Sequence, residues 1–343
     1  MAATLLSLYV CRKTMDNNSN LRKIIVAGPL PPAALALLDA RDDIVYETIT
    51  DVSEENLLAK LKDAAGITVR AAKITARVIE QSPQLQVVSR YGVGYDNVDV
   101  PALSKRGIPL TVVGTANSVA VAEAALYMML ELAKKGREHD QAVRDSNWDY
   151  RLETTAIEMW QKKLLIIGFG RIGTRTAERC RAFGMDILVA DPYVDDAVIR
   201  DAGYTPVDDF RTVLPDMDYA SLHLPLSADS ENLFGKAEFA GMKPSAILIN
   251  AARGGIVDET ALHEALKTGQ IRGAGLDVFA LEPPRADDAL FSLDNVIFSP
   301  HIAGVTREAA HRMGIACVQN VLDALDGKLD LDMVINTDVL DKT

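Results

Sequence analysis

Short runs of β-branched and aliphatic residues alternate with helix-like stretches along most of this sequence. Such alternation is typical of right-handed βαβ units, in which parallel strands form one sheet and the connecting helices cover both of its faces. In the first part of the chain we expect strands at residues 23–28, 44–50, 66–70, 85–90 and 108–113, and helices at residues 31–40, 53–64, 74–82 and 98–107. Residues 1–116 are therefore predicted to form one α/β domain.

A long apolar segment, residues 117–136, follows this series. A polar residue at its start can cap a helix, and Gly136, after two lysines, is expected to end it. A helix with so few polar positions needs cover on several sides. Two interpretations remain open: burial within its own domain, or contact with a second copy in a homodimer. Trp148 and Tyr150 follow in a stretch that we expect to be a polar loop.

The sequence LLIIGFGRIG begins a second α/β series. A strand is expected at residues 164–167, followed by Gly168, Gly170 and Gly173 and then by a helix. In a dinucleotide-binding turn the first glycine permits the tight turn, the second lets the backbone approach a pyrophosphate, and the third lets the helix pack closely on the strand. The amides at the start of the helix then face the phosphates. Ordinary glycine turns can match this pattern, so its meaning depends on what surrounds it.

Asp191 ends the next predicted strand and follows Gly173 by 18 residues. In dinucleotide-binding folds an acid roughly 20 residues after the glycines accepts hydrogen bonds from the ribose hydroxyls. A carboxylate at this place repels a 2′-phosphate, and no arginine follows it directly, so NAD is favoured over NADP. The alternative is that Asp191 only begins a turn with Pro192.

Composition limits the classes of function. With 343 residues, 48% of them hydrophobic and 24% charged, the chain suits a globular protein of two domains. Its formal net charge of -12 disfavours a nucleic-acid partner, because binding a polyanion requires clustered lysine and arginine. Cys11, Cys180 and Cys317 lie far apart and without CxxC spacing. We therefore expect no metal site and no disulfide framework, but reduced thiols in the cytoplasm.

The N-terminal segment requires separate treatment. Its apolar stretch TLLSLYV is too short to span a bilayer and has no basic residue before it. We therefore expect neither a membrane segment nor a signal peptide. Met15 is an alternative start of translation, and residues 1–20 are expected to be loosely ordered.

Polar residues cluster after the later predicted strands, which we expect within the runs YASLHL, AILIN, GAGL and NVIF. In open parallel sheets ligands bind beyond the carboxyl ends of the strands, so these polar side chains are the candidates for chemistry. Four of them stand out: Arg253, Asp277, Glu282 and His301.

Five motifs in this sequence resemble those of the D-isomer-specific 2-hydroxyacid dehydrogenases: SRYGVGYDNVD, GFGRIG, NAARGGIVDE, GAGLDVFALEPP and SPHIAG. The resemblance extends from residue 23 to about residue 336 and is strongest to the phosphoglycerate dehydrogenase and hydroxypyruvate reductase branches. It implies two doubly wound parallel-sheet α/β domains. A Rossmann-type NAD-binding domain, residues 117–302, would be inserted into a flavodoxin-like substrate-binding domain, residues 1–116 and 303–343. The last predicted helix would return to the first domain, and the catalytic cleft would lie between the two.

The resemblance also implies catalytic roles. His301 matches the family's proton donor, a role that suits imidazole because its protonation changes near neutral pH. Glu282 matches the carboxylate that pairs with this histidine, favouring the protonated ring and fixing its orientation. Arg253 matches the arginine that grips the substrate carboxylate, since a planar guanidinium can make paired contacts. Each residue also has an alternative interpretation. His301 could be an ordinary core or surface histidine, Glu282 an exposed loop glutamate, and Arg253 a member of a surface ion pair.

For the cofactor, the resemblance implies that Asp277 accepts a hydrogen bond from the nicotinamide amide. Leu224 would border the cofactor at a position where the family often has a small polar residue. The implied NAD-binding residues are Gly168, Gly170, Arg171, Ile172, Gly173, Asp191, Leu224, Pro225, Ala251, Ala252, Asp277 and Gly304.

Substrate binding is expected to use the first domain as well. Gly92, Val93 and Gly94 follow a predicted strand, where consecutive backbone N–H groups can form an anion nest for a carboxylate. Arg70 and Arg90 also follow strands, and two guanidiniums could hold a phosphate. That would favour 3-phosphoglycerate over glycerate/hydroxypyruvate or glyoxylate. Both arginines could equally be salt-bridged parts of the scaffold.

The sequence therefore predicts an NAD-dependent D-2-hydroxyacid dehydrogenase, an oxidoreductase acting on the CH–OH group of a small 2-hydroxy acid. An alternative from another class is an NAD-sensing binding protein of the corepressor type, which uses the same scaffold. We expect a cytoplasmic homodimer with no membrane partner. The sequence ends soon after the last predicted helix, so we expect no regulatory tail domain and no feedback control by serine through one.

Overall fold

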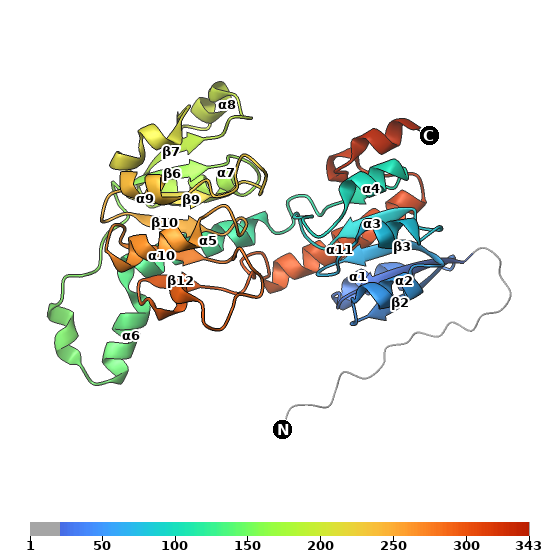
Figure 1. The fold of residues 1–343 in the computed structure, drawn as a ribbon, viewed down its shortest axis with the longest axis horizontal. Helices are drawn as coiled ribbons and strands as arrows, with labels where there is room; N and C mark the ends of the chain where they lie inside the picture. Colours follow the sequence, from blue (N-terminus) through green and yellow to red (C-terminus); the bar gives the residue numbers. More distant parts are fainter. Residues whose placement is uncertain (1–20, 343) are drawn as a thin grey trace. The chain divides into compact units, whose positions relative to one another are not determined.

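The computed structural model describes residues 21–342, which form two compact α/β units (Figure 1). Unit 1 combines the chain up to Asn117 with the chain from Arg307 onward, and unit 2 consists of Ser118–Thr306. The chain therefore passes from one unit to the other twice. The expectations for residues 1–20, Cys11 included, lie outside the described residues.

Unit 1 contains a five-stranded sheet in the order β2-β1-β3-β4-β5, and every neighbouring pair is parallel. This is the flavodoxin-like order, which confirms the predicted fold class for this part of the chain. The strands are β1 (Arg22–Ala27), β2 (Ile44–Ile49), β3 (Ala64–Val69), β4 (Val87–Arg90) and β5 (Leu110–Thr111). The helices are α1 (Pro32–Asp39), α2 (Glu54–Lys60), α3 (Ala76–Glu80), α4 (Val100–Lys105) and α11 (Arg307–Leu325), with the 3-10 turns η5 (Leu331–Met333) and η6 (Thr337–Lys342).

Helices bury both faces of this sheet. Successive side chains of a strand point to opposite faces, so neighbouring residues pack against different helices. Ile25 packs with α2, α3 and α4, whereas Ile24 packs with α1 and α11. Helix α11 comes from the far end of the chain and lies against α1, β3 and β4. The approach is close: a Cβ atom on Gly66 of β3 would lie 2.9 Å from a methyl group of Val321.

The helix expected at residues 53–64 is shorter than the sequence indicated. It ends at Lys60, and β3 already begins at Ala64. Ala64 is fully buried and pairs alongside Lys23 of β1, so pairing in the sheet takes these residues out of the helix.

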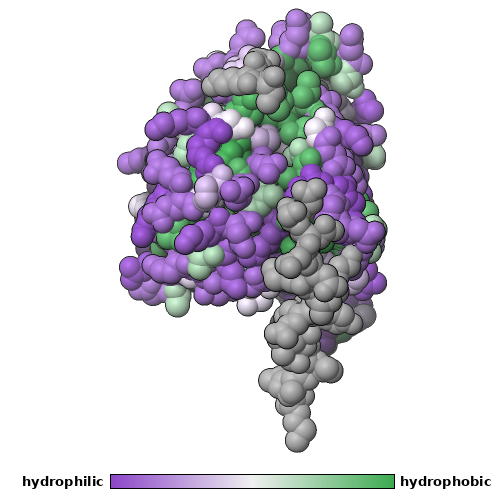
Figure 2. All heavy atoms as spheres, turned by 90° about the vertical axis from the view of Figure 1, so that its right-hand side faces the viewer, coloured by the Kyte–Doolittle hydropathy of each residue, from purple (hydrophilic) through white to green (hydrophobic). Residues whose placement is uncertain are grey.

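The molecular face in Figure 2 is mainly hydrophilic, with hydrophobic side chains gathered in its upper part.

Unit 2 contains a seven-stranded sheet in the order β12-β11-β10-β9-β6-β7-β8, again with only parallel pairs. The strand order reverses at β6, as in a Rossmann fold, which confirms the predicted class. The strands are β6 (Lys163–Ile167), β7 (Asp186–Ala190), β8 (Thr205–Pro206), β9 (Tyr219–Leu222), β10 (Ile247–Asn250), β11 (Gly273–Leu276) and β12 (Val296–Phe298).

Helices cover both faces of this sheet as well. One face packs against α5 (Ser118–Lys134), α7 (Gly173–Ala182) and α8 (Asp196–Asp201). The other face packs against α9 (Lys236–Gly241) and α10 (Glu259–Lys267), together with the 3-10 turns η2 (Phe210–Thr212), η3 (Leu214–Asp216) and η4 (Ala289–Ser292). The apolar α5 contacts α7, β10, β11 and β12, so packing within unit 2 accounts for its burial.

The long helix stops just before Gly136, as the sequence predicts, but Gly136 also begins a second helix that the sequence did not indicate. Helix α5 ends at Lys134, Lys135 takes a left-handed conformation with φ 54°, and Gly136 begins a second helix, α6 (Gly136–Arg144). The reason is the carboxylate of Glu131, which accepts a hydrogen bond from the backbone N–H of Arg137 at 2.7 Å. A Cβ atom at position 136 would lie 2.6 Å from this carboxylate. A 3-10 turn, η1 (Trp148–Leu152), follows and carries the two aromatic residues.

Two structural facts bear on the sequence expectations about membranes and thiols. Among residues 21–342, none of the helices combines the length and apolar character that crossing a membrane demands. Cys180 and Cys317 are buried free thiols, and burial raises the pKa of each to about 12.

Candidate functional site

The glycine-rich turn follows β6 in the centre of the unit 2 sheet. Gly168 has φ +93°, and a Cβ atom there would lie 2.5 Å from the carbonyl oxygen of His223. A Cβ atom on Gly173 would lie 1.9 Å from the carbonyl oxygen of Gly168. The fold itself therefore requires these two glycines, whereas a Cβ atom on Gly170 would meet nothing within 4 Å. The open space at Gly170 leaves room for a ligand beside the turn, which fits a pyrophosphate.

The remaining residues of the turn differ in their surroundings. Arg171 is exposed at the start of α7, so its guanidinium is accessible to an anion. Ile172 is half-buried and packs against Val121, Ala251 and Ala303. This small cluster fixes the turn against α5 and against the loops that follow β10 and β12.

The carboxylate of Asp191 connects the glycine turn to the end of β7. Its Oδ2 accepts from the backbone N–H of Phe169 at 2.7 Å, and its Oδ1 accepts from that of Tyr193 at 2.9 Å. The bond from Tyr193 forms the turn with Pro192 that the sequence offers as the alternative role of Asp191. Each carboxylate oxygen can accept a second hydrogen bond, so the turn and ribose binding are compatible.

The segment after β9 lies directly against the glycine turn. The backbone nitrogen of Leu224 would lie 3.1 Å from a Cβ atom on Gly168, and Pro225 is exposed. Before them, the imidazole of His223 contacts the Ser221 hydroxyl at 2.9 Å, and burial lowers the pKa of His223 to about 3. A ring that stays neutral here suits a structural role for His223.

His301 and Glu282 form a close pair at the carboxyl end of the sheet. Nδ1 of His301 lies 2.7 Å from Oε2 of Glu282, and Oε1 of Glu282 accepts from the backbone N–H of Phe279 at 3.1 Å. The His301 side chain is 51% exposed, and its backbone takes a left-handed conformation with φ 52°. Because Glu282 contacts Nδ1, Nε2 is the ring nitrogen left for a contact with another molecule.

Asp277 supports the loop that carries His301. Its backbone oxygen accepts from the N–H of His301 at 2.8 Å. Its carboxylate accepts from the N–H groups of Ile302 at 2.9 Å and Ala303 at 3.0 Å, and also from the Ser299 hydroxyl. Burial raises the pKa of Asp277, and these hydrogen bonds oppose that effect. Sequence reasoning missed this role, because the donors lie more than 20 residues away and belong to another strand–loop unit.

Arg253 follows β10. The neighbouring strand in the sheet, β11, leads to the loop that carries Glu282. Its guanidinium donates to the carbonyl of Ala252 at 2.7 Å. Asn250 shapes the turn: its amide donates to the carbonyl of Arg253 at 2.9 Å, and its oxygen accepts from the N–H of Ala252 at 3.1 Å. Gly254 presses on the loop after β11, since a Cβ atom there would lie 1.8 Å from the carbonyl oxygen of Phe279.

Loops of three neighbouring strands therefore meet at one edge of unit 2. The order β12-β11-β10 brings the His301, Glu282 and Arg253 loops side by side at the carboxyl ends of the strands. Such an edge is the place where α/β folds bind ligands. Gly304 follows the Asp277-bound amides of the His301 loop. No three His, Cys, Asp or Glu side chains of the described residues gather in a way that could hold a metal ion.

In unit 1 the two predicted phosphate ligands have different environments. Arg90 donates to the backbone carbonyls of Gly94 at 2.6 Å and Val69 at 2.9 Å, and also to that of Arg70. It therefore acts on the scaffold, where it holds the loop that contains Gly92, Val93 and Gly94. The Arg70 guanidinium lies 5.3 Å from the ring centroid of Tyr91 and is exposed, and within residues 21–342 it makes no ion pair.

Comparison with known proteins identifies the relatives of this chain. Residues 126–303 match the family model described as "D-isomer specific 2-hydroxyacid dehydrogenase, NAD binding domain", a range that includes the glycine turn, Arg253, Glu282 and His301. The chain belongs to the D-isomer-specific 2-hydroxyacid dehydrogenase family. This confirms the family resemblance of the five motifs.

Individual members of the family are similar over nearly the whole chain. The D-3-phosphoglycerate dehydrogenase of Methanocaldococcus jannaschii is 39% identical over 91% of this chain and 59% of its own length. A protein structure from Thermus thermophilus is 31% identical with a TM-score of 0.83, covering 91% of this chain and 100% of that one. The NADPH-dependent glyoxylate/hydroxypyruvate reductase of Sinorhizobium meliloti, in complex with citrate, is 28% identical with a TM-score of 0.81, covering 92% and 97%. The chain spans about three fifths of the length of the curated D-3-phosphoglycerate dehydrogenases it matches.

Proposed function

We propose that this chain is an NAD-dependent D-2-hydroxyacid dehydrogenase that interconverts a short 2-keto acid and the corresponding D-2-hydroxy acid. The observation that carries the proposal is the His301–Glu282 pair, joined at 2.7 Å at the same sheet edge as the Arg253 turn and in the same unit as the glycine turn. Unit 2 is then the cofactor-binding domain, and unit 1 is the substrate-binding domain. Membership of the family supports the same reaction.

The bound nicotinamide would supply or accept the hydride at the substrate carbon. The glycine turn with Arg171, Leu224 and Pro225 would hold its phosphates, and the loop residues Ala251, Ala252, Asp277 and Gly304 would border its nicotinamide end. Asp191 favours NAD, since a carboxylate at the ribose repels a 2′-phosphate. The Sinorhizobium meliloti relative is NADPH-dependent by name, so both cofactors belong in the test.

Two side chains would act on the substrate, and a third would hold one of them in place. His301 would carry a proton on Nε2 for transfer to and from the substrate oxygen, while Glu282 holds the ring through Nδ1. The Arg253 guanidinium would bind the substrate carboxylate and polarise the neighbouring carbonyl group.

Unit 1 would supply further binding energy for the substrate. The amides of Gly92, Val93 and Gly94, held in place by Arg90, form a loop suited to an anion. Arg70 is the candidate for a phosphate group, which would favour 3-phosphoglycerate. The name of the Methanocaldococcus jannaschii relative supports this substrate, and that of the reductase from Sinorhizobium meliloti supports hydroxypyruvate or glyoxylate.

The assembly that we propose is a cytoplasmic homodimer. Helix α6 and η1 carry the apolar side chains of Val143, Trp148 and Leu152, which are 62%, 64% and 73% exposed. These elements border a hollow of about 1090 Å³ that is lined on its other side by β12 and η4. Large apolar side chains that are exposed beside a hollow favour contact with a protein partner. We propose a second copy of this chain as that partner, because most oligomers are built from identical subunits.

Steady-state oxidation of NADH and NADPH with a panel of short 2-keto acids tests the function. We expect turnover with NADH that falls by roughly 10²–10⁴-fold in His301→Ala, the range typical of losing a general acid. Arg253→Ala should lose turnover as well, because the substrate carboxylate is then unbound. The control His311→Ala removes a histidine from α11 in unit 1 and should change nothing. Wild-type protein that binds NAD but turns over none of the acids would support the corepressor-type binding module instead.

The substrate is tested by comparing kcat/KM for 3-hydroxypyruvate phosphate with that for hydroxypyruvate. Arg70→Ala should remove any preference for the phosphorylated acid, because it deletes the exposed guanidinium. Arg77→Ala, which removes an exposed guanidinium from α3, is the matched control. An unchanged ratio in Arg70→Ala would remove Arg70 from the substrate site.

A further inference from the structure

Glu259, the last residue of the NAARGGIVDE motif, makes a contact that helix capping does not explain. It is the first residue of α10, yet Asp258 caps this helix by accepting from the N–H groups of Thr260 and Ala261, both at 3.0 Å. The Glu259 side chain instead leaves the helix. Its Oε1 accepts from the backbone N–H of Ala280 at 2.7 Å, in the loop after β11.

The same loop carries the acid partner of His301. The N–H groups of Phe279 and Ala280 are consecutive, and each is bound by a different carboxylate, Glu282 at 3.1 Å and Glu259 at 2.7 Å. The carbonyl of Phe279 faces the backbone of Gly254, where no side chain would fit. One peptide group therefore connects the Arg253 turn, the Glu282 loop and the first turn of α10.

The surroundings of Glu259 are unfavourable for a carboxylate. Burial raises the pKa of Glu259, and the negative charges of Asp288, Asp258 and Glu282 raise it further, while the hydrogen bond from Ala280 opposes them. A single hydrogen bond to an amide offsets such a cost only in part. A carboxylate at such a place favours a role other than stability, because local violations of this kind concentrate at functional sites.

We infer that Glu259 is a positioning residue. It holds the loop from residue 277 to residue 282 so that Glu282 contacts Nδ1 of His301 and the loop stays packed against the Arg253 turn. This inference rests on the proposed function. Glu259 itself touches neither Glu282 nor His301 through a hydrogen bond, and it acts through the backbone of Ala280.

Crystal structures of Glu259→Ala and Glu259→Gln test the inference without any need for turnover. Glutamine keeps an oxygen that can accept from the Ala280 N–H, whereas alanine does not. We expect the His301–Glu282 contact to be lost in the alanine variant and kept in the glutamine variant. A contact that persists at 2.7 Å in Glu259→Ala would overturn the inference, whatever the activity of the wild-type protein.

Kinetics separate positioning from a purely structural role. We expect kcat to fall by about tenfold or more in Glu259→Ala, since small misplacements of catalytic groups have effects of this size, with little change in KM for NADH. Glu259→Gln should restore kcat, and Glu264→Ala, on the exposed side of the same helix, should leave it unchanged. A lowered Tm with unchanged kcat in Glu259→Ala, or an equal loss in Glu259→Gln, would overturn the inference. Wild-type protein without turnover on any 2-keto acid would instead contradict the proposed function.

Discussion

At the scale of single residues, the glycines of the turn after β6 separate what the fold requires from what a ligand requires. A side chain on Gly173 would collide with the backbone of Gly168, whereas one on Gly170 would point into open space. The structure therefore accounts for Gly173 by packing alone. Packing does not account for Gly170, so we expect it to serve a ligand that approaches the backbone.

We predict that Gly170→Ala leaves the Tm of the protein unchanged but weakens NAD binding by about tenfold or more, because the added methyl group occupies the space of the pyrophosphate. Gly173→Ala should weaken NAD binding and also destabilise the fold by about 1–3 kcal/mol, as overpacking does. Titration calorimetry and thermal unfolding of both variants make the comparison. Wild-type NAD affinity in Gly170→Ala would show that the cofactor lies elsewhere.

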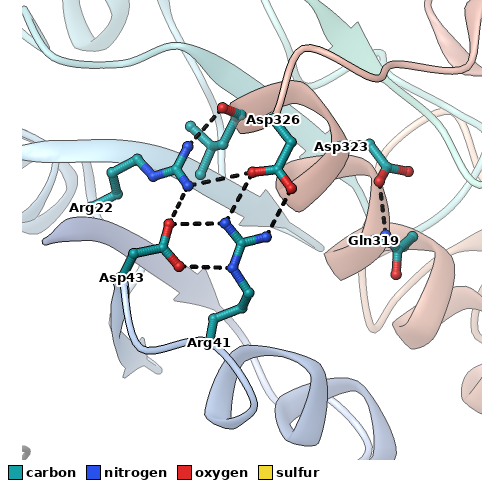
Figure 3. Close-up of polar contacts among 7 residues, drawn as sticks. Arg22, Arg41, Asp43, Gln319, Asp323 and Asp326 are labelled. Atoms are coloured by element: carbon teal, nitrogen blue, oxygen red, sulfur yellow. Dashed lines mark hydrogen bonds and ion pairs between the residues drawn. The ribbon is translucent and has the colours of Figure 1, made fainter.

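At the scale of elements, a network of charged side chains lies at the C-terminal end of α11 and connects this helix to the sheet of unit 1 (Figure 3). Arg41 binds Asp43 through two nitrogens, at 2.7 and 2.8 Å, and binds Asp326 at the end of α11 with two bonds of 2.9 Å. Arg22 contacts Asp43 as well and donates to the carbonyl of Leu325 at 2.6 Å. The network thus ties the last turn of the helix to the starts of β1 and β2.

Arg41→Ala is predicted to lower Tm at pH 7 and low salt, because it removes the guanidinium shared by both carboxylates. Hydrogen bonds from Arg41 hold the pKa values of Asp43 and Asp326 below the usual range. Carboxylates with lowered pKa stabilise the fold above the unfolded value of roughly 3.9, and this stabilisation is lost as the pH falls further. The effect of the variant should therefore diminish below about pH 4 and in high salt.

Gln319→Ala is the matched control for this prediction. Gln319 lies on the same helix and bonds only to Asp323 in Figure 3, at 2.8 Å, outside the network. Equal losses of Tm in the two variants would show that the network adds nothing to the anchoring of α11.

At the scale of the whole molecule, α6 and η1 bear on assembly. The hollow beside them is lined by both charged and apolar groups, including Arg137, Asp294 and Phe291. If a second copy covers α6 and η1, a charge in place of one of their exposed apolar side chains should prevent association, because a buried unpaired charge is costly.

We predict that Trp148→Glu converts a dimer into monomers, as measured by light scattering coupled to size-exclusion chromatography. Leu331→Glu is the control, because this residue is similarly exposed, at 61% against 64%, but lies in unit 1. A wild-type chain that is monomeric at all concentrations, or a Trp148→Glu variant that stays dimeric, would contradict the homodimer.

The sequence by itself determined the features that depend on short stretches of chain. Alternating apolar runs placed the strands of both parallel sheets except the two-residue β8, and three glycines marked the turn after β6, because strand burial and turn geometry are local properties. Only the tertiary structure decided how distant groups meet. Glu131 accepts from the first turn of a second helix that begins at Gly136, and Arg90 donates to the carbonyls of Gly94, in the loop after its own strand, and of Val69, at the end of β3. Asp277 and Glu259 accept from amides 26 and 21 residues away, since hydrogen bonds across a sheet edge follow strand order, which no local pattern records.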